Sequence, residues 1–211
     1  MSAMFTDEQV MIRDMAQKFA KDRLLPYSEA WDRDSHFPVD VIKAAAELGF
    51  AGIYVKDDVG GSGLTRTDAA LIFEQLSYGD VSTAAFISIH NMASWMIDTF
   101  GSDLQRQEWV PRLTTMDLIA SYCLTEPGAG SDAASLKTRA VKDGDEYVIT
   151  GTKQFISGAG VSDVYVLMAR TSDDGAKGVS AFIIEKRTPG LSFGANERKM
   201  GWKSQPTAQV I

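Results

Sequence analysis

The apolar residues of this chain change their spacing near residue 116, and this change limits the folds that are available. Before that point they repeat at helical intervals. Beyond it, apolar and polar residues nearly alternate around Asp143-Gly144, the strongest hairpin signal in the chain. No long helical segment separates the two strand-like runs at 164–170 and 179–186. The pattern predicts an α+β protein in which a helical part precedes a strand part, and it argues against a doubly wound sheet.

Helix-terminus signals divide the first part of the chain. Thr6 and Gln9 form a capping-box pattern, and Ser102 is placed to cap a further helix. Helices are expected over 38–48, where proline stands at the start, and over 81–100. We therefore expect an all-α domain over residues 1–116, followed by an antiparallel, barrel-like β domain over residues 117–211.

The last residues read as the opening of a strand that ends in two apolar residues, Val210 and Ile211. A strand that stops there would present an exposed edge. Two interpretations remain open: either a longer protein has been cut here, or another segment completes the sheet.

Composition excludes several classes of function. The 28 acidic residues outnumber the 21 basic ones, the net charge is −7, and no basic cluster is present, so a nucleic-acid partner is not expected. No apolar run approaches the roughly 18 residues needed to span a membrane, and the N-terminus lacks signal- or transit-peptide character. The single cysteine, Cys123, and two histidines, His36 and His90, do not form a metal-binding pattern. We expect an intracellular protein.

The stretch YCLTEPGAGSDAAS, residues 122–135, concentrates turn-forming and small residues directly after an apolar run. Two glycines this close allow backbone N–H groups to approach a diphosphate where a β-carbon would collide. A Rossmann fingerprint is rejected because a hairpin follows instead of a long helix, and a P-loop is rejected because no Lys-Ser/Thr pair follows the glycines. From the local pattern alone, a glycine-rich turn without a ligand remains equally open.

The same stretch resembles the flavin-binding signature of the acyl-CoA dehydrogenase family. The match runs through Tyr122, Cys123, Leu124, Thr125, Glu126, Pro127, Gly128, Ala129, Gly130, Ser131 and Asp132. A second family element fits Phe155-Ile156-Ser157-Gly158, and the GGSGL loop at 60–64 also matches. The resemblance extends over essentially the whole chain. Within the family, residues 87–95 and 153–170 look most like members that act on a short branched-chain thioester, isobutyryl-CoA.

The resemblance implies that residues 122–131 and 155–157 contact FAD. Thr125 would hydrogen-bond the isoalloxazine, while Ser131 would lie near the diphosphate and also touch the acyl-CoA substrate. Phe155 would pack on the flavin ring and Ser157 would hydrogen-bond near its O4/N5 edge. Many relatives carry tryptophan and threonine at the last two positions. We therefore expect Phe155 to retain the stacking role and to lack any donor role.

The resemblance further implies an α,β-dehydrogenation of the acyl-CoA, with electrons passed to electron-transfer flavoprotein by a homotetramer. The family's catalytic glutamate lies in a C-terminal helical bundle to which nothing in these 211 residues corresponds, so no base is assigned and the chain alone is expected to be inactive. Glu126 is interpreted as a structural hydrogen-bonding residue. The alternative is a noncatalytic module that binds an acyl-CoA or a partner.

Family analogy also assigns an acyl-pocket lining to one face of the 81–100 helix. Two side chains in these regions are interpreted as structural: His90 as a core histidine and Cys123 as a small buried residue without nucleophilic chemistry. The residues of the expected lining are Ser82, Thr83, Phe86, Ile87, His90 and Asn91.

Overall fold

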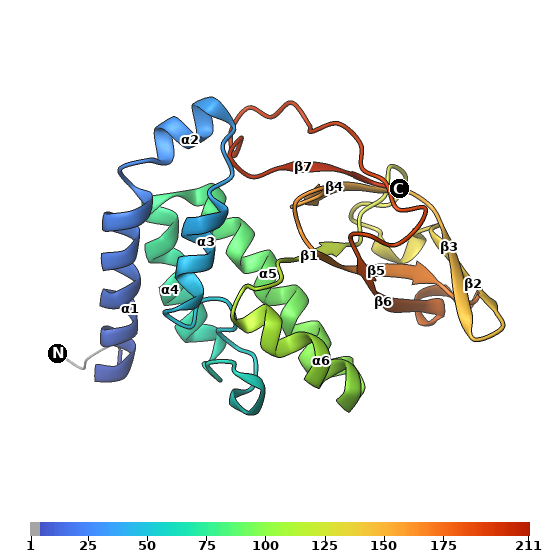
Figure 1. Cartoon of the computed structure of the whole chain (residues 1–211), viewed down its shortest axis with the longest axis horizontal. Coiled ribbons are helices and arrows are strands. Elements are labelled where there is room, and N and C mark those ends of the chain that lie inside the picture. The colour runs from blue at the N-terminus through green and yellow to red at the C-terminus, as the bar shows by residue number, and fades with distance from the viewer. Residues whose placement is uncertain (1–4) are drawn as a thin grey trace. The chain divides into compact units, whose positions relative to one another are not determined.

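The computed structural model describes residues 5–211, which divide into two compact units (Figure 1). The helical unit comprises the described residues through Leu118 together with Lys199–Gln205. The sheet unit comprises Ile119–Arg198 and Pro206–Ile211. The backbone therefore passes from one unit to the other three times, after residues 118, 198 and 205.

The helical unit confirms the prediction of an all-helical first part. The predicted capping box Thr6–Gln9 is present, and the predicted cap Ser102 forms a capping box with Gln105; in both pairs each side chain bonds the backbone of the other residue. Pro38 occupies the N-cap position of the predicted second helix. The α-helices are α1 (Asp7–Phe19), α2 (Ser28–Asp34), α3 (Val39–Ala46), α4 (Arg66–Gly79), α5 (Val81–Phe100) and α6 (Asp103–Thr114), and a π-helical turn, Ala20–Leu24, continues α1.

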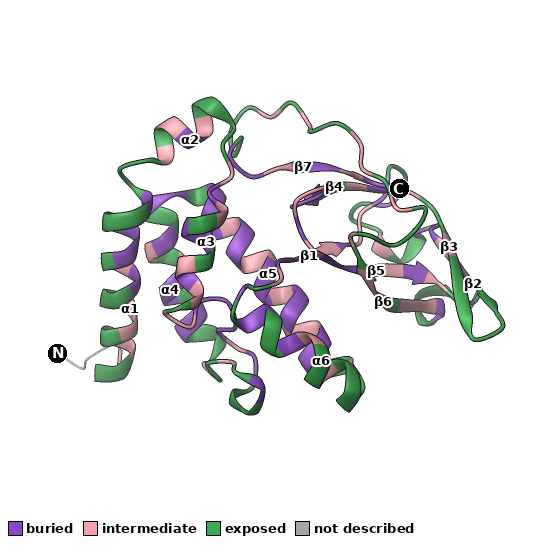
Figure 2. Ribbon diagram, viewed as in Figure 1, coloured by how far each residue is buried: buried purple, intermediate pink, exposed green. Residues whose placement is uncertain are grey.

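The core of the helical unit forms where α4 packs against α1 and α5. Ile72 and Leu76 of α4 and Phe86 and Ile87 of α5 are fully buried. Figure 2 shows that α5 is buried along much of its length, as expected for a helix whose apolar residues are not confined to one stripe. Burial of such side chains, at about 25 cal/mol per Å² of apolar surface, is the main stabilising contribution here.

The sheet unit contains seven strands, in two sheets. One sheet has the order β1-β5-β2-β3, with β6 also paired to β5, and the other consists of β4 and β7. The strands are β1 (Ala120–Cys123), β2 (Arg139–Asp143), β3 (Glu146–Thr150), β4 (Lys153–Ser157), β5 (Val164–Arg170), β6 (Val179–Glu185) and β7 (Thr207–Val210).

The strand pairings are mostly antiparallel, as predicted. The Asp143-Gly144 signal is confirmed: Gly144 has φ +61°, and Asp143 pairs with Glu146 across the turn between β2 and β3. Two pairings, β1 with β5 and β2 with β5, are parallel. The alternation of residues did not predict these, because parallel partners are joined by long connections and leave no local turn signal.

Both edges of the last strand are paired. Strand β7 pairs with β4 along one edge and hydrogen-bonds residues 192–197 along the other. Ser192 and Ile211 exchange two backbone hydrogen bonds of 2.9 Å, and the Glu197 N–H donates to the Thr207 carbonyl at 2.8 Å. A segment of the chain itself, residues 192–197, therefore covers the second edge of β7.

The segment Lys199–Gln205, here called the strap, leaves the sheet unit and joins the helical unit. The Lys203 N–H donates to Asp32 Oδ1 at 2.7 Å, so the strap is anchored to α2. Trp202 borders a small hollow with residues of α2 and of the α4–α5 junction. Ser204 is buried, whereas Met200 is fully exposed.

Candidate functional site

The signature segment leaves β1 and folds into a tight turn. Glu126 and Ala129 exchange two backbone hydrogen bonds, of 3.0 and 3.1 Å, around the exposed pair Pro127-Gly128. The short turn Ala133–Ser135 follows. Among the described residues, no acceptor bonds the N–H groups of Gly130 and Ser131 or the Ser131 hydroxyl. This turn therefore presents free donors to a ligand.

Neither Gly128 nor Gly130 is required by the protein's own structure. Their φ angles lie outside the left-handed region, and an added Cβ would meet nothing within 4 Å. Backbone conformation and packing, the two usual reasons for glycine, are both missing here. The remaining physical reason is an external group that approaches the backbone closely, and the free N–H groups suit an anion such as a diphosphate.

The second predicted segment contains a β-bulge in β4. Lys153 pairs with Val210 and Ile156 with Ala208, so β4 carries one residue more than β7 between these pairs. Phe155 lies in the bulge with φ +59° and is 59% exposed. A bulky residue rarely adopts this conformation, which costs of order 1–3 kcal/mol. The bulge directs the aromatic ring out of the core. In this position the ring can stack on a flat ligand.

The two predicted segments lie side by side. The Gln154 N–H donates to the Thr125 carbonyl at 2.8 Å, and the Ser121 hydroxyl donates to the Ser157 carbonyl. The exposed Phe155 ring and the free donors of the turn thus belong to two hydrogen-bonded segments. A flavin nucleotide, with a flat ring system at one end and a diphosphate further along, fits this set of groups.

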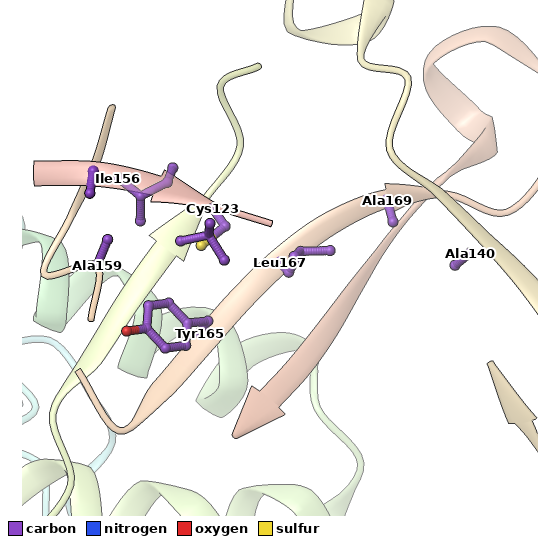
Figure 3. Close-up of a cluster of buried hydrophobic side chains, with 9 residues drawn as sticks. Cys123, Ala140, Ile156, Ala159, Tyr165, Leu167 and Ala169 are labelled. Carbon is purple, nitrogen blue, oxygen red and sulfur yellow. The ribbon is translucent and has the colours of Figure 1, made fainter. Parts of the chain in front are cut away.

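Four of the thirteen predicted contact residues turn their side chains into the protein. Cys123 and Ile156 join the core of the sheet unit (Figure 3), and Glu126 and Ala129 are also buried. Burial raises the pKa of the Cys123 thiol to about 12, in agreement with an inert structural cysteine. These four can touch a ligand only through backbone atoms. The accessible ones are Tyr122, Leu124, Thr125, Pro127, Gly128, Gly130, Ser131, Phe155 and Ser157.

Glu126 forms an ion pair that sequence reasoning missed. Its carboxylate accepts from Lys153 Nζ at 2.8 Å and from the N–H groups of Lys137 and Thr138 at 2.6 and 2.9 Å. Burial raises the pKa of this carboxyl, but the hydrogen bonds outweigh it and bring the pKa to about 2. Such a carboxylate is a poor base, which agrees with the structural interpretation of Glu126. No local pattern indicates Lys153, which lies 27 residues further along the chain.

The predicted acyl-pocket residues of α5 are all buried. Asn91 accepts from the Ile53 N–H at 2.7 Å and donates to the Phe50 carbonyl at 2.7 Å, which ties α5 to the loop after α3. His90 Nε2 lies 2.9 Å from the Leu113 carbonyl, and burial lowers its pKa to about 4. The interpretation of His90 as a core histidine is therefore confirmed.

A hollow of about 450 Å³ opens elsewhere in the sheet unit, bordered by β3, the residues around Pro189 and the end of β7. None of the thirteen predicted contact residues lines it. The predicted contacts instead form an open edge made by the turn and the bulge. In the described part of the chain, no helix has the length and apolar character to cross a bilayer, and no cluster of potential metal ligands occurs.

Comparison with known proteins identifies the family. The model of the acyl-CoA dehydrogenase N-terminal domain matches residues 6–117, and that of the middle domain matches residues 121–211. The chain belongs to the acyl-CoA dehydrogenase family. The two matches confirm the family resemblance from which the site was predicted. Members of this family are oxidoreductases.

Individual acyl-CoA dehydrogenase relatives support this assignment. The mitochondrial isobutyryl-CoA dehydrogenase of Dictyostelium discoideum is 55% identical over 207 residues, which cover 98% of this chain and 50% of the relative. A chain in a structure of the electron transferring flavoprotein of Acidaminococcus fermentans superposes with a TM-score of 0.94 at 37% identity, covering 100% of this chain and 56% of that one. A glutaryl-CoA dehydrogenase of Mycobacterium smegmatis in complex with FADH2 gives 0.92 at 29% identity, covering 98% and 53%. The chain thus spans about half the length of the relatives that it matches.

Proposed function

We propose that this chain supplies the flavin-binding part of an FAD-dependent acyl-CoA dehydrogenase that acts on a short branched-chain thioester of the isobutyryl-CoA type. One observation supports the proposal above the others: a strained, exposed Phe155 lies beside a turn whose two glycines the protein itself does not need. The 55% identity to an isobutyryl-CoA dehydrogenase supports the choice of substrate.

Bound FAD would supply the oxidant that accepts a hydride from the acyl chain. The chain's own residues would bind and orient it. Phe155 would pack against the ring system, and the hydroxyls of Thr125 and Ser157 would hydrogen-bond its polar edge. Ser131, with its free hydroxyl and the nearby N–H of Gly130, would bind the diphosphate and touch the acyl-CoA.

We assign no catalytic base within the described residues. Glu126, a carboxylate within the signature segment, is committed to three donors in the interior. The base, electron transfer to an electron-transfer flavoprotein and a homotetrameric assembly remain proposals that rest on the family. The same holds for the compartment, which would be the mitochondrial matrix in a eukaryote and the cytoplasm in a bacterium.

Flavin binding is the first test. We expect the longest form of the protein that its gene encodes to quench the fluorescence of added FAD in a saturable titration, and we expect Ser131→Ala and Phe155→Ala to weaken binding. Ser180→Ala is a matched control, because Ser180 lies on β6, outside both predicted segments, and its hydroxyl bonds that of Thr171. Equal affinity in all four proteins would refute the assigned contacts.

Dehydrogenation is the second test. Isobutyryl-CoA should bleach the visible absorbance of the bound flavin in the longest form of the protein that its gene encodes, and it should do so faster than glutaryl-CoA. Flavin-loaded protein that binds isobutyryl-CoA without bleaching would instead identify a noncatalytic acyl-CoA-binding module.

A further inference from the structure

The Lys153–Glu126 ion pair lies almost entirely inside the sheet unit. The two side chains are 1% and 7% exposed, and Lys153 Nζ also donates to the Leu124 carbonyl at 3.0 Å. Through Glu126 the pair reaches the backbone of Lys137 and Thr138. One ammonium group therefore connects three separate segments: the root of the signature turn, the start of β2 and the start of β4.

A buried ion pair contributes little net stability to a protein core. Taking both groups out of water is costly, and a well-packed apolar pair of the same volume is often as stable or more stable. The charged pair adds geometric specificity, because its hydrogen bonds fix where each partner backbone must lie. Its position within the unit therefore matters more than its net contribution to stability.

That position is the junction of the two predicted flavin-contact segments. Lys153 is the last regularly paired residue before the bulge, and its side chain faces the core, as does that of Ile156 three residues later. In a regular strand, residues three apart face opposite sides. The extra residue in the bulge restores the inward direction and leaves Phe155 pointing outward. Because Glu126 fixes the side chain of Lys153, it also fixes where the bulge begins.

We propose that the Lys153–Glu126 pair is a positioning device that sets the signature turn and the Phe155 ring at the separation that one flavin requires. Lys153 and Glu126 act through Leu124, Thr125 and Phe155 and need not touch the flavin themselves. This inference rests on the proposed function, since it names the residues that organise the same site.

The first test replaces the pair by uncharged residues of similar shape. Lys153→Met keeps the unbranched chain, and Glu126→Gln keeps one oxygen that can accept from Lys137 or Thr138, which bond different oxygens of the carboxylate. The double variant buries no charge, so it folds even if a single variant does not. We expect its affinity for FAD to fall roughly 10- to 100-fold, the range seen for residues that orient metal ligands. The control is Asp98→Asn, which removes a charge partner of Arg106 in the helical unit. It should lower stability and leave FAD affinity unchanged.

The second test reads the position of Phe155 without any flavin. 4-Fluorophenylalanine incorporated at position 155 should give one narrow fluorine NMR signal in the parent and in the Asp98→Asn control. The double variant should give a broadened or divided signal. An unchanged signal together with unchanged FAD affinity would overturn the inference and leave the proposed function standing. If the parent itself binds no FAD, the proposed function fails, and the fluorine signal alone decides whether the pair positions the ring.

Discussion

Glycine-rich loops occur in both units, and they contain glycine for different reasons. In the helical unit, a Cβ on Gly61 would collide with the Val55 carbonyl and lie 2.7 Å from the Lys56 oxygen, while Gly60 has φ +86°. In the sheet unit, Gly128 and Gly130 have neither constraint. The first loop needs glycine in order to fold. The second has room for larger residues, so its glycines point to a molecule outside the chain.

The largest effect on stability should come from Gly61→Ala. The atoms that it would meet belong to the backbone and cannot move without disrupting the loop, so we expect the free energy of unfolding to fall by about 3 kcal/mol or more. Urea denaturation followed by circular dichroism measures this. If this variant were as stable as the wild type, the loop of the helical unit would not need glycine in order to fold.

Acid should weaken the sheet unit through Glu126. The pKa of this carboxyl is near 2 in the folded state and 4.5 ordinarily, so its stabilisation is complete above about pH 4.5 and is lost as the pH falls towards 2. The contribution is roughly 3 kcal/mol. Urea denaturation between pH 7 and pH 3 should show this loss, and Glu126→Gln should flatten it. The control is Asp173→Asn, which removes an exposed partner of Arg139 instead of a buried one.

A smaller effect is expected at Phe155, where the ordinary preference of a strand for alanine over glycine should be reversed. In an ordinary strand, alanine is more stable than glycine, but at φ +59° glycine avoids the strain of a Cβ. Phe155→Gly should therefore be more stable than Phe155→Ala by about 1 kcal/mol, while both lose affinity for FAD. Equal stability of the two variants would mean that the bulge relaxes when the ring is removed.

The smallest effect on stability should come from Gly128→Ala and Gly130→Ala. Their Cβ atoms enter open space, so the free energy of unfolding should change by no more than about 0.5 kcal/mol. The affinity for FAD should nevertheless fall about tenfold or more, which corresponds to about 1.4 kcal/mol. Gly144→Ala provides the reverse control, because φ is +61° at this hairpin turn and no predicted flavin contact is near in sequence. It should lose stability and keep its affinity.

The parts of the fold that depend on local signals could be predicted from the sequence. A capping residue and its partner lie three positions apart, and a two-residue turn fixes the register of a hairpin, which is why the start of α1 and the β2–β3 hairpin were placed correctly. The parallel pairing of β1 with β5 depends on residues more than 40 positions apart and leaves no local trace. The same is true of residues 192–197, which complete the sheet beside β7.

The candidate site divides in the same way. The residue types in the signature turn and at Phe155 indicated a flavin through a family resemblance. The bulge, the left-handed backbone of Phe155 and the partnership of Lys153 with Glu126 did not follow from it. Each of these depends on how β4 meets β1 and β7, and such contacts are set by packing over long sequence distances. The sequence therefore indicated which groups would meet the ligand, and the structure indicates how they are held.

The strap makes the two units poor candidates for exchange between proteins. A recombinant chimera that takes residues 119–211 from another protein would also replace Lys199–Gln205, including the Lys203 N–H that bonds Asp32 of α2. The foreign segment would then lack Trp202, which borders a hollow with residues of α2. Successful shuffling would have to cut the gene at three places, one for each passage of the backbone between the units.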